Sequence, residues 1–534
     1  MIKEIDPVAS SGVSAAMPMQ DEIIAFLSDP KTHSGEEQEV TCINTHGAVI
    51  FLAGEFAYKI KRAVKLNYLD YSSLDKREKM CRLEFLINRR TAPEIYIEVL
   101  PINRTINNGL SLGGRGVTVE WAIKMHRFSQ ENLLSNIAMS GGLTDNLITQ
   151  LAEMIAKYHH ASAPAPGGNC LNGVQKLQQI VTSLNSSFNG APKEFIREFA
   201  ETYHSNLSAA MEQNRSVVLE RERLGFSRRC HGDMHLQNIV FLSGQPKLFD
   251  AIEFDDDIAT IDILYDLAFL LMDLWFHGLH DQANLLFNEY LRCLDDEQNL
   301  RGLAIMPMYI SMRAAIRAMV GIDRMSQIDE KERNDNYATI RDYLTLAKSA
   351  LKTNHPSLIL IGGRSGTGKS TMGRAISSSI PPLPGAVHLR SDVERKTMFD
   401  VGPQIRLPEE CYTEHYSDEV YKILLRKASN ILDSGHSVIV DAVFLSQSHR
   451  VMFEELAEGR AIDLKPIWLD AHHDALQARV EARQNDASDA GRTVVKKQFD
   501  VKSEPKNWIN IDAGSEPKIV KDRICEALNI NTVL

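Results

Sequence analysis

Apolar and polar residues alternate along several short segments in the first quarter of the chain, a period of two that is typical of β-strands. The segments with this alternation are residues 40–53, 55–62, 94–102 and 117–125. Between the second and third of them, residues 72–90 carry apolar side chains at helical spacing, with Ser72 or Ser73 as the N-cap. The pattern predicts a group of strands with one helix inserted among them.

Helical spacing dominates in blocks between about Leu133 and Lys352. A stretch rich in proline and glycine, residues 162–169, predicts a loop in the first block. The most apolar stretches of the chain are residues 263–276 and 302–322, and both contain charged side chains. We therefore expect buried core helices there and no membrane segment.

From Leu358 onward the rhythm changes to strand, helix, strand. Each strand candidate is a short apolar run, as expected where a strand is buried on both faces of a parallel sheet. These runs are residues 358–363, 386–392, 436–442, 465–470 and 507–513. They predict a doubly wound α/β domain.

Composition narrows the choice of partners and compartment. The net charge of −11 argues against a broad basic surface, so we do not expect nucleic acid as a partner. The seven cysteines form no C-x-x-C pair, which predicts neither a zinc site nor a disulfide framework. The first twenty residues lack the basic and apolar regions of a signal peptide, so we expect a cytoplasmic protein. Its oligomeric state is left open.

Residues 363–370 spell G-x-x-x-x-G-K-S, a P-loop pattern, between a predicted strand and a predicted helix. Such glycines let backbone N–H groups wrap phosphate oxygens, and the following helix offers its positive N-terminus. Lys369 would bridge the β and γ phosphates of ATP, and Ser370 would hold Mg²⁺. The residues predicted to bind nucleotide here are Gly363, Arg364, Ser365, Gly366, Thr367, Gly368, Lys369, Ser370 and Thr371.

Two aspartates near the ends of predicted strands extend this site. Asp441 is a predicted Mg²⁺ ligand, and Asp392 a predicted base for the attacking hydroxyl. For each, the alternative is a helix N-cap. Arg479, Arg483 and Arg492 could close over the phosphates as a lid, with Arg483 touching nucleotide, or form a solvated face.

A second pattern lies earlier, in the spacing of a kinase catalytic loop: H-x-D, four residues, then Asn. Asp233 is its predicted base and Asn238 a predicted Mg²⁺ ligand. Asp250 follows an apolar run in the place of a second Mg²⁺ ligand, after a predicted hairpin that turns at residues 242–246. We expect Asp266 to hold this loop and not to touch substrate.

Such a site also requires a lysine and a glutamate that hold the phosphates. Lys59 and Lys61 point to one face of a strand, and either could reach the phosphates. Glu84 is the predicted partner; the alternative is a surface lysine and a solvated glutamate. No G-x-G-x-x-G loop precedes Lys59, and only Gly47 sits at the first hairpin, so a pseudokinase is an open alternative.

Residues 389–396, 437–444 and 479–490 resemble kinases of the AAA_33 group. This group is similar to zeta-toxin-like, gluconate-kinase-like and shikimate-kinase-like P-loop enzymes. The resemblance covers residues 356–534. It implies transfer of the ATP γ-phosphate to a small-molecule hydroxyl, with Asp392 as the base.

Residues 231–238 and 249–256 resemble the aminoglycoside phosphotransferase family, kinase-like enzymes on a two-lobed fold. Residues 45–62, 69–77 and 88–102 are similar to the N-terminal half of bacterial bifunctional aminoglycoside phosphotransferase/ATP-binding proteins. This whole-chain resemblance covers both halves in the same order. It implies that the tandem arrangement is a family architecture.

A chain of 534 residues is too long for one core and predicts about three or four structural units. We expect a flexible tail over residues 1–20, a kinase-like domain over 21–352 and a P-loop domain over 353–534. The predicted fold class is α/β: a two-lobed, protein-kinase-like (α+β) domain followed by a doubly wound parallel-sheet P-loop kinase domain.

The predicted function is phosphate transfer by two kinase modules that use ATP and Mg²⁺. The predicted acceptor is a small molecule: a sugar, an aminoglycoside-like compound or a nucleotide-sugar. One alternative makes the P-loop half a polynucleotide 5′-hydroxyl kinase. Another is a nucleotide-gated regulator with a pseudokinase N-terminal half.

Overall fold

The computed structural model describes residues 17–33, 39–45, 47–66, 69–165, 171–191, 193–325, 330–481, 487–501 and 504–530. They form two compact units that interleave along the chain. The first unit contains residues 1–177, 222–270 and 323–337. The second contains residues 178–221, 271–322 and 338–534.

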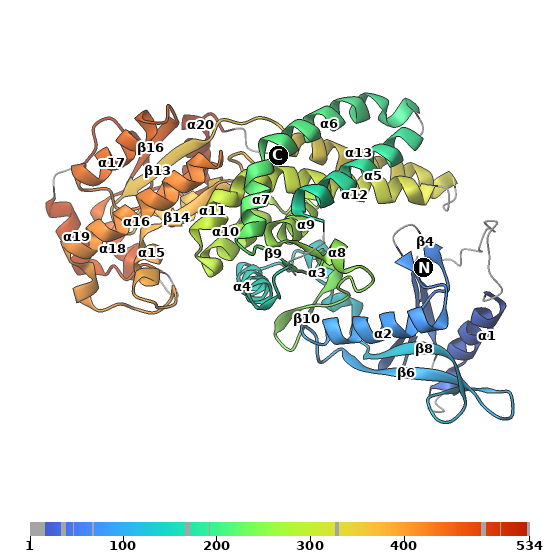
Figure 1. Cartoon of the computed structure of the whole chain (residues 1–534). Helices are drawn as coiled ribbons and strands as arrows, with labels where there is room; N and C mark the ends of the chain where they lie inside the picture. The colour runs from blue at the N-terminus through green and yellow to red at the C-terminus, as the bar shows by residue number, and fades with distance from the viewer. Residues whose placement is uncertain are drawn as a thin grey trace. The chain divides into compact units, whose positions relative to one another are not determined.

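The first unit is built on a six-stranded antiparallel sheet with the order β1-β2-β3-β8-β6-β7 (Figure 1). Its strands are β1 Thr41–Asn44, β2 Ala48–Ala53, β3 Phe56–Lys61, β6 Tyr96–Arg104, β7 Leu110–Leu112 and β8 Val117–His126. A short pair, β4 Lys65–Leu66 and β5 Leu69–Asp70, follows β3. Helix α2 (Leu74–Asn88) packs on β6 and β8, and helix α1 (Met17–Ser28) contacts β2.

Alternate residues of β3 face opposite sides of this sheet. Tyr58 joins an apolar core with helix α1, whereas Ala57 joins a second core with helix α2. Lys59 and Lys61 follow Ala57 at intervals of two, so they lie on the face that α2 covers. The period-two pattern therefore determines which helix the two lysines meet.

Two details at helix starts refine the predictions. Ser73, and not Ser72, caps α2, because its Oγ accepts a hydrogen bond from the Lys76 N–H. Helix α1 begins at Met17, inside the predicted tail of residues 1–20, since its apolar side chains are buried against the sheet. Residues 1–16 lie outside the described residues.

The remainder of the first unit holds the predicted catalytic loop. Strands β10 (Ile239–Leu242) and β11 (Gln245–Leu248) form the predicted hairpin. Strand β9 (Ser227–Arg229) pairs with β12 (Thr260–Asp262), so the loop and hairpin emerge between two paired strands.

Helices dominate between β8 and the parallel sheet, as predicted. They are α3 Leu134–Met139, α4 Asp145–Ala161, α5 Gly173–Gly190, α6 Lys193–Gln213, α7 Arg215–Arg223, α8 Asp256–Ala259, α9 Ile263–Phe276, α10 His280–Leu294, α11 Glu297–Arg301, α12 Met306–Arg324 and α13 Glu330–Ala350. In the described part of the chain, residues 297–324 are long and apolar enough to cross a membrane, but 67% of their most apolar window is buried inside the protein. That burial is expected of a core helix.

The second unit contains a five-stranded parallel sheet with the order β14-β15-β13-β16-β17. Its strands are β13 Ser357–Gly363, β14 Val387–Arg390, β15 Val438–Asp441, β16 Asp463–Asp470 and β17 Ile509–Asp512. The helices interspersed with these strands are α14 Lys369–Ser377, α15 Ser391–Met398, α16 Glu414–Asp433, α17 Gln447–Glu458, α18 His473–Glu481, α19 Arg492–Asp500 and α20 Pro517–Ala527.

Strand β13 is buried on both faces, which explains its continuous apolar run. Ile359 and Ile361 join the core formed with α14 and α20, and every residue from Leu358 to Gly363 is buried. Helices α16 and α17 contact the same sheet. The strand order reverses around β13, so its carboxyl end is the point where ligands bind in doubly wound folds.

Helices α10 to α12 belong to the same compact unit as the parallel sheet. The unit therefore extends across the predicted domain boundary between residues 352 and 353. The domain limits of 21–352 and 353–534 stay a prediction.

His436, just before β15, predicts a pH-dependent stability. It is 1% exposed, its Nε2 donates to Gly385 O at 2.9 Å, and burial lowers its pKa to about 4. In the unfolded chain His436 would protonate near pH 6.5. Lowering the pH therefore favours unfolding until the pH falls to the pKa of His436 in the folded state. We expect this group to remove roughly 2 kcal/mol of stability between pH 7 and pH 5.

Urea unfolding at both pH values would measure this loss. The comparison is with His436→Gln, which keeps a donor for Gly385 but cannot protonate. An equal pH dependence in the two proteins would contradict the prediction.

Candidate active sites

The two lysines of β3 share one buried carboxylate. Lys59 Nζ donates to Glu84 Oε1 at 2.9 Å and to Asp250 Oδ1 at 2.5 Å. Lys61 Nζ donates to Glu84 Oε2 and to Glu253 Oε1. Glu84 is 0% exposed and both lysines are buried, so the alternative of a surface lysine and a solvated glutamate is wrong.

Mutual attraction keeps these groups charged. Burial by itself lowers the pKa of Lys59, but the carboxylates of Asp250 and Glu84 outweigh it and raise that pKa above its usual range. Burial would raise the pKa of Asp250, but the neighbouring Lys59 lowers it overall. A lysine and a carboxylate that are both charged at neutral pH can hold phosphate and metal, respectively.

Asp250 occupies a strained backbone position. Its φ of +59° is left-handed, which non-glycine residues adopt at a cost. Its N–H donates to Tyr96 Oη at 3.3 Å, and the next amide, of Ala251, donates to Asn88 Oδ1 at 2.8 Å. These contacts hold the turn, and the Asp250 side chain stays 41% exposed, open to a ligand.

The predicted base and metal ligand of the loop lie in contact. Asn238 Nδ2 donates to Asp233 Oδ2 at 2.9 Å, and His235 Nε2 lies 3.4 Å from the same oxygen. The Asp233 side chain is 42% exposed. Its charge also acts to raise the pKa of Asp250, so the two carboxylates belong to one site.

Asp266 holds this loop, as predicted. The fully buried carboxylate accepts hydrogen bonds from the backbone N–H groups of His231 at 3.0 Å and Gly232 at 2.9 Å. His159 Nε2 lies 3.2 Å from it. Both carboxylate oxygens are thereby engaged in fixing the backbone next to Asp233.

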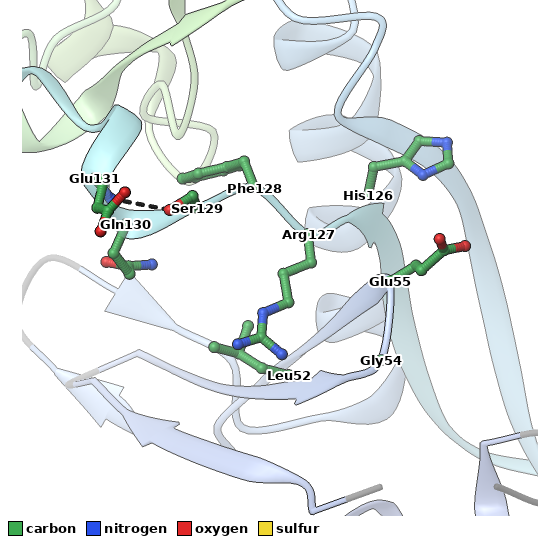
Figure 2. Close-up of a pocket in the computed structure, with 9 residues that line it drawn as sticks. All are labelled: Leu52, Gly54, Glu55, His126, Arg127, Phe128, Ser129, Gln130 and Glu131. Carbon is green, nitrogen blue, oxygen red and sulfur yellow. Dashed lines mark hydrogen bonds between the residues drawn. The ribbon is translucent and has the colours of Figure 1, made fainter.

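A cavity of about 840 Å³ lies where the end of β8 meets the turn between β2 and β3. Arg127 N–H donates to Glu55 O at 2.8 Å, which joins the two segments. Figure 2 shows the Arg127 side chain extending toward Leu52, whereas the side chains of Glu55 and His126 point away from Leu52. The cavity is lined by Leu52, Gly54, Glu55, His126, Arg127, Phe128, Ser129, Gln130 and Glu131. Its volume lies in the usual range for small-molecule sites.

In the second unit the P-loop connects β13 to α14, as its pattern predicts. Its glycines have positive φ angles: Gly363 146°, Gly366 93° and Gly368 87°. A Cβ on Gly363 would lie 2.5 Å from the carbonyl oxygen of Leu469, so only glycine fits there. Helix α14 begins at Lys369, which places Ser370 and Thr371 in the first turn, where free N–H groups attract anions.

Hydrogen bonds within the loop hold its shape. Thr367 Oγ1 donates to Arg364 O at 2.8 Å, and Lys369 Nζ donates to the same carbonyl at 3.1 Å. The Ser365 N–H donates to Gln498 Oε1 of α19 at 2.8 Å. Lys369 therefore lies folded along the loop, with its ammonium close to the loop backbone.

Arg364 has a structural role at one side of the loop. Its Nη1 lies 3.3 Å from Asp470 Oδ1, and its Nη2 donates to Glu504 Oε1 at 2.6 Å. The guanidinium also covers the ring of Phe499 at 4.3 Å. These four residues line a cavity of about 830 Å³ at the carboxyl ends of β16 and β17, beside the P-loop.

Asp441 ends β15 next to the P-loop strand. It is 3% exposed, and α17 begins only at Gln447, so the alternative of a helix N-cap is wrong. Its Oδ2 lies 3.3 Å from His388 Nε2 and 4.0 Å from Arg390 Nε. Burial would raise the pKa of Asp441, but His388 and Lys369 lower it overall, so the carboxylate stays charged.

Asp392 lies in the first turn of α15. The N-cap of that helix is Arg390 and no side chain caps it, so the N-cap alternative is wrong here too. Burial raises the pKa of Asp392, while the charge of Lys369 and a hydrogen bond from Ser488 act in the opposite direction. A carboxyl group with a raised pKa beside a phosphate-binding lysine is suited to proton acceptance.

The predicted lid is only partly described. Arg483 lies outside the described residues. Arg492 forms an exposed ion pair with Glu481, and Arg479 lies in α18. The lid role of these arginines stays a prediction.

An unpredicted anchor holds the segment just before α19. The carboxylate of Asp489 accepts hydrogen bonds from Tyr412 Oη at 2.5 Å, Leu407 N–H at 3.0 Å and Lys396 Nζ at 3.2 Å. Lys396 is 1% exposed, so this ion pair is well shielded from water. It fixes Ser488, the neighbour that contacts Asp392.

Sequence reasoning assigned no role to several of these residues. Glu253 could have been suspected, because it follows Asp250 by three residues in a segment already predicted to bind metal. Ser488 and Asp489 lie within residues 479–490, which carry the resemblance to AAA_33, but no individual role could be assigned to them because their partners lie far away in sequence.

Comparisons with known proteins match two separate segments of the chain. Residues 127–303 match the family APH, described as "Phosphotransferase enzyme family", and residues 358–505 match AAA_33, described as "AAA domain". Uncharacterized protein Rv2004c of Mycobacterium tuberculosis is 26% identical over 464 residues, which cover 85% of this chain and 88% of that protein.

Two solved structures are similar to parts of this chain. A gluconokinase from Sinorhizobium meliloti is 19% identical, with a TM-score of 0.26, over 33% of this chain and 93% of its own. A choline/ethanolamine kinase family protein from Mesorhizobium loti is 13% identical, with a TM-score of 0.35, over 63% of this chain and 100% of its own.

The predicted fold class is confirmed: a protein-kinase-like part precedes a parallel-sheet P-loop part. The chain thus joins a domain of the phosphotransferase enzyme family to an AAA_33 P-loop kinase domain, and so carries two kinase-like modules.

Proposed function

We propose that this protein is an ATP- and Mg²⁺-dependent phosphotransferase whose two sites each transfer the γ-phosphate to a hydroxyl group of a small molecule. The observation that carries the proposal is the position of Lys59 Nζ, 2.9 Å from Glu84 and 2.5 Å from Asp250. Phosphoryl transfer requires a phosphate-binding lysine held by a glutamate, next to a metal-binding carboxylate. Lys59, Glu84 and Asp250 are the residues proposed for these three roles.

In the first site the roles follow from exposure and charge. Lys59 is the phosphate lysine, because it adjoins the half-exposed Asp250, whereas Lys61 is enclosed by Glu84 and Glu253. Asp250 and Asn238 supply oxygen ligands of the kind that Mg²⁺ prefers. Asp233 orients the acceptor hydroxyl, and the cavity beside β8 takes the nucleoside.

In the P-loop site the loop amides and Lys369 bind the phosphates. Asp441 fits a metal site, because it is a buried carboxylate that stays charged at the end of β15, next to the P-loop strand. Bound Mg²⁺ would neutralise charge on the β and γ phosphates. The oxygen of the acceptor hydroxyl bonds to the γ-phosphorus while the hydroxyl proton passes to Asp392. The bond between the γ-phosphorus and the oxygen of ADP breaks.

The alternatives receive no support from the described residues. A pseudokinase would be expected to lack one of the charged groups, yet Lys59, Glu84 and Asp250 are all present and paired. The net charge of −11 gives a polynucleotide acceptor no broad basic surface.

The direct test is an acceptor screen with the full chain. The protein would be incubated with ATP, Mg²⁺ and a metabolite extract, and compounds that gain one phosphate would be identified by mass spectrometry. We expect Lys369→Ala and Asp250→Ala each to lose one set of products, because each removes a different site. Consumption of ATP with no phosphorylated product in any sample would contradict the proposal.

Substitutions of the two lysines of β3 should have different effects, one mainly on turnover and the other mainly on stability. In a Lys369→Ala background, Lys59→Met should lower turnover at the first site by about 10²–10³, since it removes a donor to the transferring phosphate. Lys61→Met leaves Glu253 buried without its cation and should cost about 3–5 kcal/mol of stability. Turnover and urea unfolding of both variants would measure this. A stability loss for Lys59→Met as large as for Lys61→Met would contradict the assignment.

Asp392→Asn should lower turnover at the P-loop site by roughly 10²–10⁴, the usual effect of removing a general base. Affinity for ATP should hardly change, because the loop amides and Lys369 still bind the phosphates. In the wild type, turnover should fall with decreasing pH at a value above the ordinary pKa of about 4 for aspartate, since the raised pKa protonates the base earlier.

The matched control is Asp400→Asn. Asp400 is exposed two residues beyond α15, and its φ of +55° is one that asparagine tolerates. Normal turnover by a normally folded Asp392→Asn protein would rule out Asp392 as the base.

A further inference from the structure

Strand β14, which leads directly into α15 and Asp392, is an edge strand of the parallel sheet. It pairs with β15 on one side, and the Val387 N–H donates to Ser437 O on that side at 3.0 Å. Among the described residues, no strand pairs with its other side. An edge of this kind requires another partner or exposure to water.

Helix α10 supplies that partner through two asparagines one turn apart. Asn288 Oδ1 accepts a hydrogen bond from the His388 N–H of β14 at 2.7 Å. Asn284 Nδ2 donates to Pro384 O and Ala386 O, both at 3.1 Å, and Asn288 Nδ2 donates to Ala386 O at 3.3 Å. The side chains thus bond the free edge as a further strand would.

Asn284 also contacts the end of α14, the helix that follows the P-loop. Ser377 Oγ of α14 donates to Asn284 Oδ1 at 2.7 Å. Gly385 has a φ of +106°, and a Cβ there would lie 2.6 Å from Asn284 Nδ2. Asn284 is 3% exposed and Ser377 is 1% exposed, so these hydrogen bonds are shielded from water. Buried amides with every group bonded specify one arrangement.

A second set of contacts reaches α15 itself. Lys427 Nζ of α16 donates to Asp295 Oδ1, at the end of α10, at 2.5 Å. The same Nζ donates to Glu394 Oε2 of α15 at 2.7 Å. Glu394 is 8% exposed and lies two residues beyond Asp392. On α11, Glu297 accepts a hydrogen bond from Arg426 of α16. Figure 1 shows α10 and α11 beside β14 and α16.

We propose that α10 and α11 position the β14–α15 segment of the P-loop site, with Asn284 and Asn288 as positioning residues for Asp392. This rests on the proposed role of Asp392 as the base. The two helices end at residue 301, within the segment 127–303 that matches the phosphotransferase family. A segment that resembles one kinase family thus completes the active site of the other.

The test uses the full chain with Asn288→Leu, which keeps volume but removes the hydrogen bonds to β14. Hydrogen exchange of a peptide covering residues 386–392 should become about fivefold to tenfold faster, the effect of losing one such hydrogen bond. In an Asp250→Ala background, hydrolysis of Mg·ATP at the P-loop site should fall by about 10- to 100-fold in kcat, since a small displacement of a catalytic group is costly. The KM for ATP should not change.

Glu289→Gln is the matched control. Glu289 lies next to Asn288 on α10, but its side chain accepts a hydrogen bond from Arg292 of the same helix and not from β14 in the described structure, so exchange and kcat should stay at wild-type values. Asp295→Asn is a milder variant in case Asn288→Leu does not fold. Its φ of +40° suits asparagine, and it weakens the Lys427 bridge to α15 without disturbing the edge.

Unchanged exchange over residues 386–392 in Asn288→Leu, or an unchanged kcat in Asp295→Asn if Asn288→Leu does not fold, would overturn the inference. Faster exchange with wild-type kcat would overturn it as well, because the helices would then stabilise the segment without positioning the base. Normal turnover of Asp392→Asn together with a lowered kcat for Asn288→Leu would instead reject the base assignment and keep the positioning of β14–α15.

Discussion

The buried carboxylate of Glu84 is the interaction on which the first site depends. A charge without solvent is costly unless opposite charges surround it, and here each carboxylate oxygen accepts from one lysine of β3. The lysines in turn bond carboxylates of the loop after β11, Lys59 to Asp250 and Lys61 to Glu253. One carboxylate on α2 therefore fixes a strand, a helix and a loop relative to each other.

This cluster contains two cations, Lys59 and Lys61, and three anions, Glu84, Asp250 and Glu253, so one negative charge is left over. The excess does not fall on Glu84 or Glu253, because both are buried and each is bonded by lysine. It falls on Asp250, whose side chain is 41% exposed. An open carboxylate with a lowered pKa is where a divalent cation would restore neutrality, which supports the proposed metal role.

Features that depend on local sequence could be predicted. The P-loop glycines, the apolar runs of the parallel sheet and the hairpin before Asp250 each follow from neighbouring residues. The choice between Lys59 and Lys61 could not be made, because both lie on the same face of β3 and only the loop around residues 250–253 distinguishes them.

Residues whose partners lie far away in sequence were missed for the same reason. Asn284 and Asn288 interrupt an otherwise apolar face of α10. Polar residues in such a pattern predict exposed positions. Their partners lie about one hundred positions further along, at 384–388. Nor could sequence show that α1 begins inside the predicted tail, since the sheet that buries its apolar side chains forms only after folding.

Both sites contain a main-chain turn with positive φ, but only in the first site does a non-glycine residue adopt it under strain. Each turn lies close to the lysine that is proposed to bind phosphate. In the P-loop glycine adopts that conformation without strain, so hydrogen bonds inside the loop suffice to hold it. In the first site Asp250 adopts it as a non-glycine residue, because its side chain is the proposed metal ligand. The strain there is held by Tyr96 and Asn88, which bond the adjoining amides. These two side chains are therefore as much a part of the site as the carboxylate that they present, although neither carries a charge.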